Sequence, residues 1–151
     1  MTSMSISETL FRRIAGHAGR TYPEECCGVL FGTEIGGGRF VQEILEIDNS
    51  QDANRRRRFL ISPAQYRDAE RQAEERRQTL LGFYHSHPDH PAIPSAFDTE
   101  HALPWFTYMI VSVAGGKAGH ASAWMLEEDR GRFAEQPLAI DTRAQRPSNV
   151  K

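Results

Sequence analysis

The spacing of apolar residues predicts a helix near the start of the chain. Ser5 and Glu8 stand at the positions of a capping box, in which two side chains bond to free backbone amides of the first turn. The pattern predicts a helix that begins after Ser5 and ends near Gly19. The residues expected on its apolar face are Ile6, Leu10, Phe11, Ile14 and Ala18.

Short apolar runs bounded by turn residues predict strands over the rest of the chain. Residues 26–31 and 39–47 have the composition of strands, and the glycine-rich turn 32–38 between them predicts a hairpin. Ser62 and Pro63 have the order of a helix cap and a first helical residue, so a charged, exposed helix is predicted over 63–78. Further strands are predicted over 58–61, 80–84, 106–113, 119–126 and 132–140, and a short helix over 96–103.

Length and charge exclude several classes of protein. The chain has 151 residues, with 18 basic and 20 acidic side chains. This length suits one domain, which we place at residues 1–140, followed by a tail at 141–151 that we expect to be disordered. Without a basic excess, a nucleic acid is not an expected partner. No apolar run reaches the roughly 18 residues of a membrane span, and the first residues lack the apolar stretch of a secretory signal, so we expect a cytoplasmic protein without a membrane partner.

The two cysteines do not form a metal or disulfide framework. Cys26 and Cys27 are adjacent, and adjacent cysteines cannot bridge each other without distorting the backbone. They also do not make the Cys-x-x-Cys spacing of a structural zinc site. We interpret both as small buried residues of a strand, so any metal must be bound by other side chains.

The segment 85–98 carries the strongest chemical pattern. His85 and His87 are two residues apart at the end of a predicted strand, so both imidazoles project from the same face. Ser95 and Asp98 begin the next helix, where both side chains can face back toward the strand end. Two imidazoles and one carboxylate form a three-ligand set that leaves zinc a fourth position for water, which is typical of a hydrolytic site.

A hydrolytic zinc site also needs a proton acceptor that is not itself a ligand. Glu24 and Glu25 precede the predicted strand 26–31, which can lie beside the histidine-bearing strand. Because adjacent side chains point in opposite directions, only one of the two carboxylates can face the metal.

Together these residues resemble the JAMM motif of the MPN+ metallopeptidases. The segment Glu25-Cys26-Cys27-Gly28 is similar to the glutamate element of the family, and the spacing to Gly28 favours Glu25 over Glu24. The segment His85-Ser86-His87-Pro88 is similar to the histidine element, and Ser95 and Asp98 follow at the family spacing. The resemblance covers most of the chain.

The resemblance implies a role for each of these positions. His85, His87 and Asp98 would be the ligands of one zinc ion per chain, Glu25 would hold and deprotonate the water, and Ser95 would help to stabilise the oxyanion. The implied fold is α/β, with a curved mixed β-sheet flanked by helices, similar to that of cytidine deaminases. A deaminase itself is not expected, because the chain has no Pro-Cys-x-x-Cys element.

The resemblance also implies a substrate. The family hydrolyses peptide or isopeptide bonds that follow the Gly-Gly tail of ubiquitin-like proteins, and this chain looks like its short, stand-alone prokaryotic branch, whose substrate is often a ubiquitin-like sulfur carrier. Two other interpretations stay open: a non-catalytic MPN scaffold that binds partners without metal, and a zinc hydrolase that acts on a small-molecule amide.

Three further features have an uncertain role in the sequence. His101 lies one turn after Asp98 and could replace it as a ligand, and His90 lies in the loop between the ligand elements, where it could contact substrate. The arginine run Arg55, Arg56, Arg57 and Arg58 is either a solvated loop or a docking patch for an acidic partner.

Overall fold

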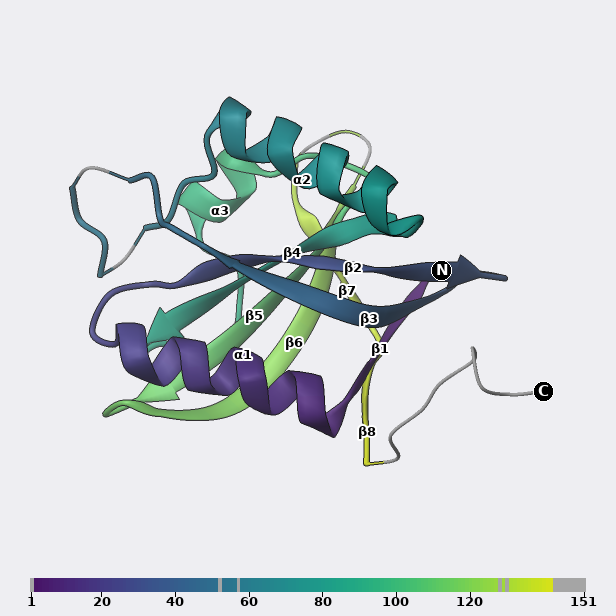
Figure 1. The fold of residues 1–151 in the computed structure, drawn as a ribbon. Helices are drawn as coiled ribbons and strands as arrows, with labels where there is room; N and C mark the ends of the chain where they lie inside the picture. The colour runs from purple at the N-terminus through teal and green to yellow at the C-terminus, as the bar shows by residue number, and fades with distance from the viewer. Residues whose placement is uncertain (1, 52, 57, 128, 130, 143–151) are drawn as a thin grey trace.

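The protein is a curved mixed β-sheet with helices on both faces, as a computed structural model shows (Figure 1). The structure describes residues 2–51, 53–56, 58–127, 129 and 131–142. Within these residues the elements in chain order are β1 (Ser3–Ser7), α1 (Glu8–Thr21), β2 (Cys27–Ile35), β3 (Gly38–Ile47), α2 (Pro63–Arg76), β4 (Thr79–Pro88), α3 (Ala96–His101), β5 (Thr107–Ala114), β6 (Lys117–Leu126), β7 (Phe133–Gln136) and β8 (Leu138–Asp141).

The histidine-bearing strand β4 lies in the middle of this sheet, whose order is β7-β6-β5-β4-β2-β3-β1-β8. Strand β4 pairs antiparallel with β2 and parallel with β5. Strands β2 and β3 form the predicted hairpin. The predicted α/β class, with helices against a curved mixed sheet and β2 beside the histidine-bearing strand, is therefore confirmed.

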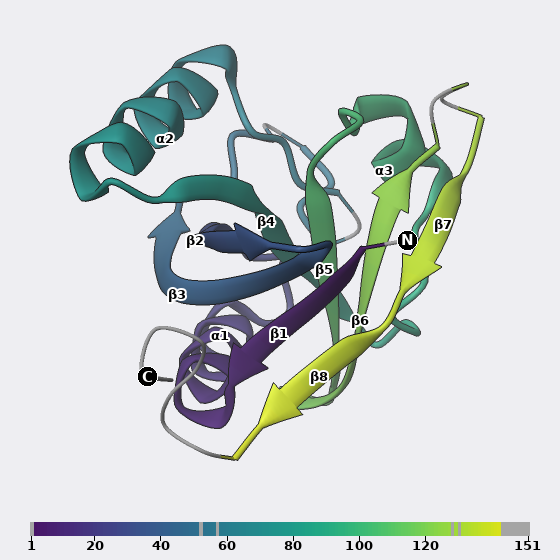
Figure 2. The ribbon, with the colours of Figure 1, turned by 90° about the vertical axis from the view of Figure 1, so that its right-hand side faces the viewer.

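The last two strands wrap the sheet nearly into a barrel. Strand β7 pairs with β6 at one edge, and β8 pairs with β1 at the other edge (Figure 2). Pro137 stands between them, and its carbonyl oxygen accepts a hydrogen bond from the amide of Met4. The single strand predicted over 132–140 is thus two strands, because proline has no amide proton to continue a ladder.

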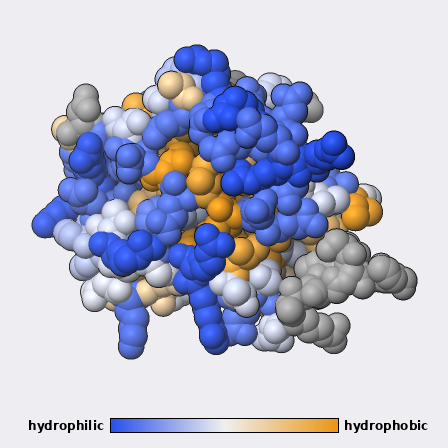
Figure 3. Space-filling model, viewed as in Figure 1, coloured by the Kyte–Doolittle hydropathy of each residue, from blue (hydrophilic) through white to orange (hydrophobic). Residues whose placement is uncertain are grey.

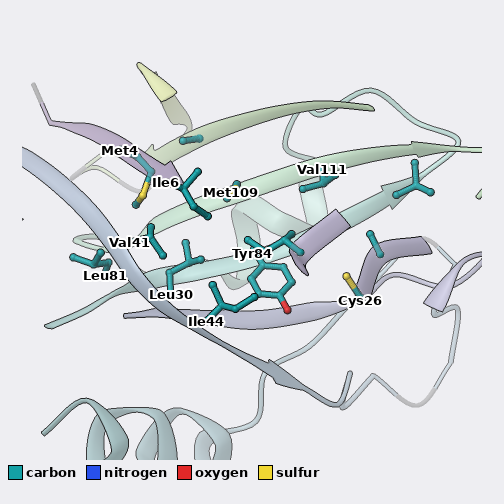
Figure 4. Packing of buried hydrophobic residues seen from close by; sticks show 14 residues of the cluster. Met4, Ile6, Cys26, Leu30, Val41, Ile44, Leu81, Tyr84, Met109 and Val111 are labelled. Carbon is teal, nitrogen blue, oxygen red and sulfur yellow. The ribbon is translucent and has the colours of Figure 1, made fainter. Parts of the chain in front are cut away.

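Each face of the sheet packs against its own helices. Alternate residues of β2 serve the two sides: Leu30 joins the cluster under α1, and Val29 joins the cluster under α2 and α3. Figure 4 shows the first cluster, in which Met4, Ile6 and Tyr84 lie beside the strand residues of β2, β3 and β5. An apolar patch lies on the surface between α2 and α1, and the rest of this face is mainly hydrophilic (Figure 3).

The N-terminal prediction was wrong in one respect. Residues 3–7 form a strand, with Met4 and Ile6 buried at alternate positions, and the helix cap is Ser7, whose side chain accepts from the amide of Leu10. Ser5 lies inside β1, paired with β3 and β8, and therefore does not cap the helix with Glu8.

Two other predictions concern irregular segments. The strand predicted over 58–61 is absent from the described part of that segment; instead the amide of Leu60 donates to Asn49 Oδ1 and its carbonyl accepts from Ser50. Asp141, the first residue of the predicted tail, is the last residue of β8, and residues 143–151 lie outside the described residues. No helix among the described residues is long and apolar enough to cross a membrane.

Candidate metal centre

Strand β4 brings the two histidines to one face of the sheet. His85 pairs with Cys27 of β2 and with Ile110 of β5, and His87 pairs with Ser112 of β5. Both imidazoles are buried, with 1% and 5% of the residue exposed. Because His85 is paired with strands on both sides and His87 is paired with β5, both imidazoles project from regular strand backbone rather than from a loop.

Asp98 reaches the same point from the start of α3. Ser95 caps this helix: its Oγ accepts from the amide of Asp98 at 3.0 Å, and Asp98 Oδ2 accepts from the amide of Ser95 at 2.9 Å. The predicted capping box is present, and it holds the carboxylate toward β4. Asp98 Oδ2 lies 3.2 Å from His85 Nε2 and 3.1 Å from His87 Nε2.

The hydrogen bonds of His87 show which nitrogen is free. His87 Nδ1 lies 2.8 Å from the carbonyl oxygen of Pro91, and a carbonyl can only accept, so Nδ1 carries the proton. In the neutral ring, Nε2 then presents a lone pair to the carboxylate of Asp98. Two acceptors at this distance repel each other unless a proton or a cation lies between them.

The pKa values of Asp98 and His85 are both lowered. Burial alone would raise the pKa of Asp98, but a proton on the neighbouring imidazoles, together with the amide of Ser95, holds that pKa well below its ordinary value, so the carboxylate is ionised. Burial lowers the pKa of His85, although Asp98 opposes the shift, so burial favours the neutral ring. A buried anion beside a neutral imidazole is a site that favours a cation.

This donor set fits a zinc ion. The three ligand atoms lie within 4.8 Å of one another. Ligand atoms around a tetrahedral zinc are separated by roughly 3.3 Å, close to the two distances between Asp98 and the imidazoles. In the described part of the chain His85 Nδ1 has no hydrogen-bond partner, so there, of the two imidazoles, that of His87 alone has the outer hydrogen bond that orients metal-ligating histidines.

Glu25 lies beside this cluster. It is 3% exposed and lines a cavity of about 250 Å³ together with His87, His90 and Ser95. Burial, together with the charge of Asp98, raises the pKa of Glu25 to about 9, and its Oε1 has no hydrogen-bond partner among the described residues. Glu24 is exposed, so the structure places Glu25 at the cluster and Glu24 away from it.

The backbone around Glu25 is held by the loop that carries the arginine run. The amide of Glu25 donates to the carbonyl oxygen of Arg55 at 2.7 Å, and Asn49 Nδ2 donates to the carbonyl oxygen of Glu25 at 3.2 Å. Asn49 also donates to the carbonyl oxygen of Arg58. Sequence reasoning missed Asn49, since a single asparagine in a polar loop gives no signal of this role.

Phe59 covers the other side of the cluster. Its ring stacks on His85 with the centroids 4.2 Å apart. A second cavity of about 120 Å³ lies there, lined mainly by apolar residues that include Phe59, Tyr66 and Phe97. Phe59 was assigned only to a strand, and its contact with His85 had no local sequence signal.

The other candidate residues of the sequence differ in where they lie relative to the three ligands. His101 is exposed, and its Nδ1 donates to the carbonyl oxygen of Phe97, so it lies outside the ligand cluster. His90 lines the front cavity. Cys26 and Cys27 are buried free thiols whose pKa values are raised by burial, which makes them poor nucleophiles.

The described members of the arginine run are exposed. Arg58 lies over the ring of Phe97, with the guanidinium carbon 4.8 Å from the ring centroid. Arg55 lines a polar cavity behind Glu25, and Arg57 lies outside the described residues. Arg55 and Arg58 therefore lie next to the candidate metal centre.

Comparison with known proteins identifies relatives along nearly the whole chain. A family model described as prokaryotic homologs of the JAB domain matches residues 7–127. The chain is 33% identical over 120 residues to a desampylase of Haloferax volcanii, covering 79% of this chain and 80% of the relative. A solution structure of a protein from Salinibacter ruber is 37% identical, with a TM-score of 0.72 and 95% of each chain covered. A JAB1/MPN domain protein of Archaeoglobus fulgidus shares the fold, with 17% identity, a TM-score of 0.56, and coverage of 90% of this chain and 99% of that one.

Proposed function

The chain belongs to the stand-alone prokaryotic JAMM/MPN family, the prokaryotic homologs of the JAB domain, and from this premise we propose that it is a zinc-dependent peptidase or isopeptidase. Its substrate is the amide bond that follows the C-terminal Gly-Gly of a ubiquitin-like sulfur-carrier protein. The observation that carries the proposal is the convergence of His85, His87 and Asp98 beside a buried carboxylate, Glu25, whose Oε1 has no hydrogen-bond partner among the described residues.

The two imidazoles and Asp98 would hold one zinc ion per chain. Zinc, when bound, supplies Lewis acidity that makes water a nucleophile near neutral pH and polarises the scissile carbonyl. All three residues are buried, and the cavity lined by His87, Glu25 and Ser95 is a route by which substrate and solvent would reach them.

Glu25 moves the proton. Its carboxylate takes a proton from the attacking water and gives it to the leaving amine as the C–N bond breaks. Burial raises the pKa of Glu25, so it is a stronger base than an exposed carboxylate, and a neighbouring cation favours its ionised form. The unbonded Oε1 is the atom that would accept this proton.

Ser95 stabilises the oxyanion. Its Oγ already accepts a hydrogen bond from the amide of Asp98, so its hydroxyl proton is available to donate. Ser95 lines the same cavity as Glu25. The scissile carbonyl would lie in this cavity. Donation to a developing oxyanion stabilises the transition state more than the ground state.

A Gly-Gly tail suits this cavity. The space beside Glu25 and Ser95 is about 250 Å³, and two residues without side chains can enter it in an extended conformation. The ubiquitin-like body would stay outside. The similarity to a desampylase supports a protein substrate of this kind.

The experiment uses a sulfur-carrier protein extended beyond its Gly-Gly. We expect mass spectrometry to show cleavage directly after the second glycine, and no cleavage when both glycines are replaced by valine. Cleavage of neither protein, or equal cleavage of both, contradicts the ubiquitin-like assignment and favours a small-molecule amide. Absence of bound zinc in the purified protein contradicts the proposal that the protein is a zinc-dependent enzyme and favours a non-catalytic scaffold.

A further inference from the structure

Ser86 stands between the two candidate ligands in the chain and joins their strand to Glu25. It is fully buried. Its Oγ accepts a hydrogen bond from the amide of Cys26 at 2.8 Å, and its own amide donates to the carbonyl oxygen of Cys26 at 3.2 Å. Cys26 directly follows Glu25, so these two bonds connect the candidate base to the strand that carries the imidazoles.

The hydroxyl oxygen of Ser86 accepts the hydrogen bond that its backbone carbonyl oxygen would accept in a regular strand pair. The ladder between β2 and β4 ends at the pair of Cys27 and His85, and Cys26 faces Ser86 one step further on. In a regular antiparallel pair the two residues exchange both backbone hydrogen bonds. Here the amide of Cys26 donates to the side chain instead, so the approach of the two chains at this point depends on the hydroxyl.

The peptide group between Glu25 and Cys26 is held at both ends. Ser86 accepts from its N–H, and Asn49 Nδ2 donates to its carbonyl oxygen. The preceding amide, that of Glu25, is bonded to Arg55. By contrast, the carboxylate atom Oε1 has no hydrogen-bond partner among the described residues. The place of this carboxylate is therefore set mainly by its backbone.

We propose that Ser86 is a positioning residue, whose hydroxyl fixes the carboxylate of Glu25 relative to His85 and His87. Among the described residues that bond to the backbone of Glu25 and Cys26, Ser86 comes from the strand of the imidazoles, whereas Asn49 and Arg55 belong to a loop. The hydroxyl thus links base and ligand pair directly. The proposal rests on the proposed function, because it assigns Glu25 a catalytic task.

Ser86→Ala tests the proposal, with Thr107→Val as its matched control. Thr107 is also a fully buried hydroxyl residue of the sheet, but its Oγ1 accepts from Arg39 and donates to Gln136, away from the candidate centre. Both variants lose one buried hydroxyl and should lose similar thermal stability. Both should retain the zinc content of the wild type, because the ligands are unchanged.

Two measurements separate positioning from stability. Amide hydrogen exchange, followed by NMR without substrate, should be ~10-fold or more faster at Cys26 in Ser86→Ala and unchanged there in Thr107→Val. Against the Gly-Gly fusion, Ser86→Ala should lower kcat by ~10–100-fold with KM within about twofold of the wild type, since a misplacement of about 1 Å has this effect. Thr107→Val should keep both constants.

Each outcome decides one question. Unchanged exchange at Cys26, or an unchanged kcat, in Ser86→Ala overturns the proposal. An equal loss of kcat in Thr107→Val also overturns it, because the effect would then follow stability. A wild type that cleaves no Gly-Gly substrate contradicts the proposed function, and the exchange rates still establish whether Ser86 holds the peptide group after Glu25.

Discussion

The ring of Tyr84 lies so close to Gly28 that a β-carbon at Gly28 would come within 2.2 Å of two ring atoms. The two residues face each other across the ladder between β2 and β4. The hydroxyl of Tyr84 shares a hydrogen bond of 2.7 Å with His17 Nδ1 of α1. The glycine three positions after Glu25 therefore leaves room for the ring that ties the sheet to the helix beneath it.

Gly28→Ala should destabilise the protein by roughly 2–3 kcal/mol, because the buried ring cannot move away without breaking its contact with His17. Denaturant unfolding measures the loss. Gly16→Ala is the control: a β-carbon there meets nothing within 4 Å, and a helical alanine should stabilise by about 0.5–1 kcal/mol. Equal stability of wild type and Gly28→Ala would contradict the packing described.

Loss of any one ligand should remove the metal. His85→Ala, His87→Ala and Asp98→Ala should each reduce bound zinc from one per chain to near zero, because two ligands make a weak site. Elemental analysis after dialysis measures the content. His101→Ala should keep its zinc, since His101 is exposed and bonded to Phe97. Full zinc in Asp98→Ala would refute the assignment of Asp98.

Glu25→Gln should preserve the fold and the zinc but lower kcat by ~10³-fold or more, because an amide cannot carry the proton. Glu24→Gln is the matched control and should have wild-type kinetics, since Glu24 is exposed. Steady-state cleavage of the Gly-Gly fusion compares the two. A wild-type rate in Glu25→Gln would rule out a proton transfer by Glu25.

The stability of the zinc-free protein should fall with rising pH because of Glu25. Its pKa is near 4.5 when unfolded and is raised to about 9 in the fold by burial and by the charge of Asp98. Between these values the unfolded state has lost a proton that the folded state retains, so stability decreases as pH rises. At pH 8 zinc-free Glu25→Gln should be roughly 1–3 kcal/mol more stable than the wild type, and similar to it at pH 4. Parallel stability curves for the two proteins would refute this.

The arginine run should affect binding rather than chemistry. Replacement of Arg55, Arg56, Arg57 and Arg58 by serine should raise KM for an acidic ubiquitin-like substrate several-fold and leave kcat nearly unchanged, because surface charges act equally on ground and transition states. The effect should shrink at 0.5 M salt if it is electrostatic. Arg67→Ser and Arg71→Ser in the exposed helix α2 serve as charge controls. An unchanged KM would leave the run as a solvated loop.

The candidate centre was predictable where its geometry is local. Ser95 and Asp98 form a capping box three residues apart, and His85 and His87 share a strand face, so short-range rules place each pair. The bond from Ser86 to Cys26 spans 60 residues, and that from His17 to Tyr84 spans 67. Neither hydrogen bond can be recognised from the residues next to it in the sequence, and sequence reasoning missed both.

The N-terminus shows how two patterns can compete. Ile6 and Leu10 have a helical spacing that made the segment from Ser5 look like the start of the helix, although Met4 and Ile6 also alternate as in a strand. The alternation prevails because β1 is paired on both sides, with β3 and with β8. A strand whose partners lie far along the chain is hard to recognise from its own few residues.

The pairing of β8 with β1 has a consequence for the order in which the sheet assembles during synthesis. The pairing of Met4 with Leu138 joins residues 134 positions apart, whereas Glu25, the two histidines and Asp98 all precede β5. A growing chain can thus pair β2, β3, β4 and β5 around the candidate centre before β8 has been made. Until then β1 lacks its outer neighbour, and the nascent protein presents an open strand edge that other chains can engage.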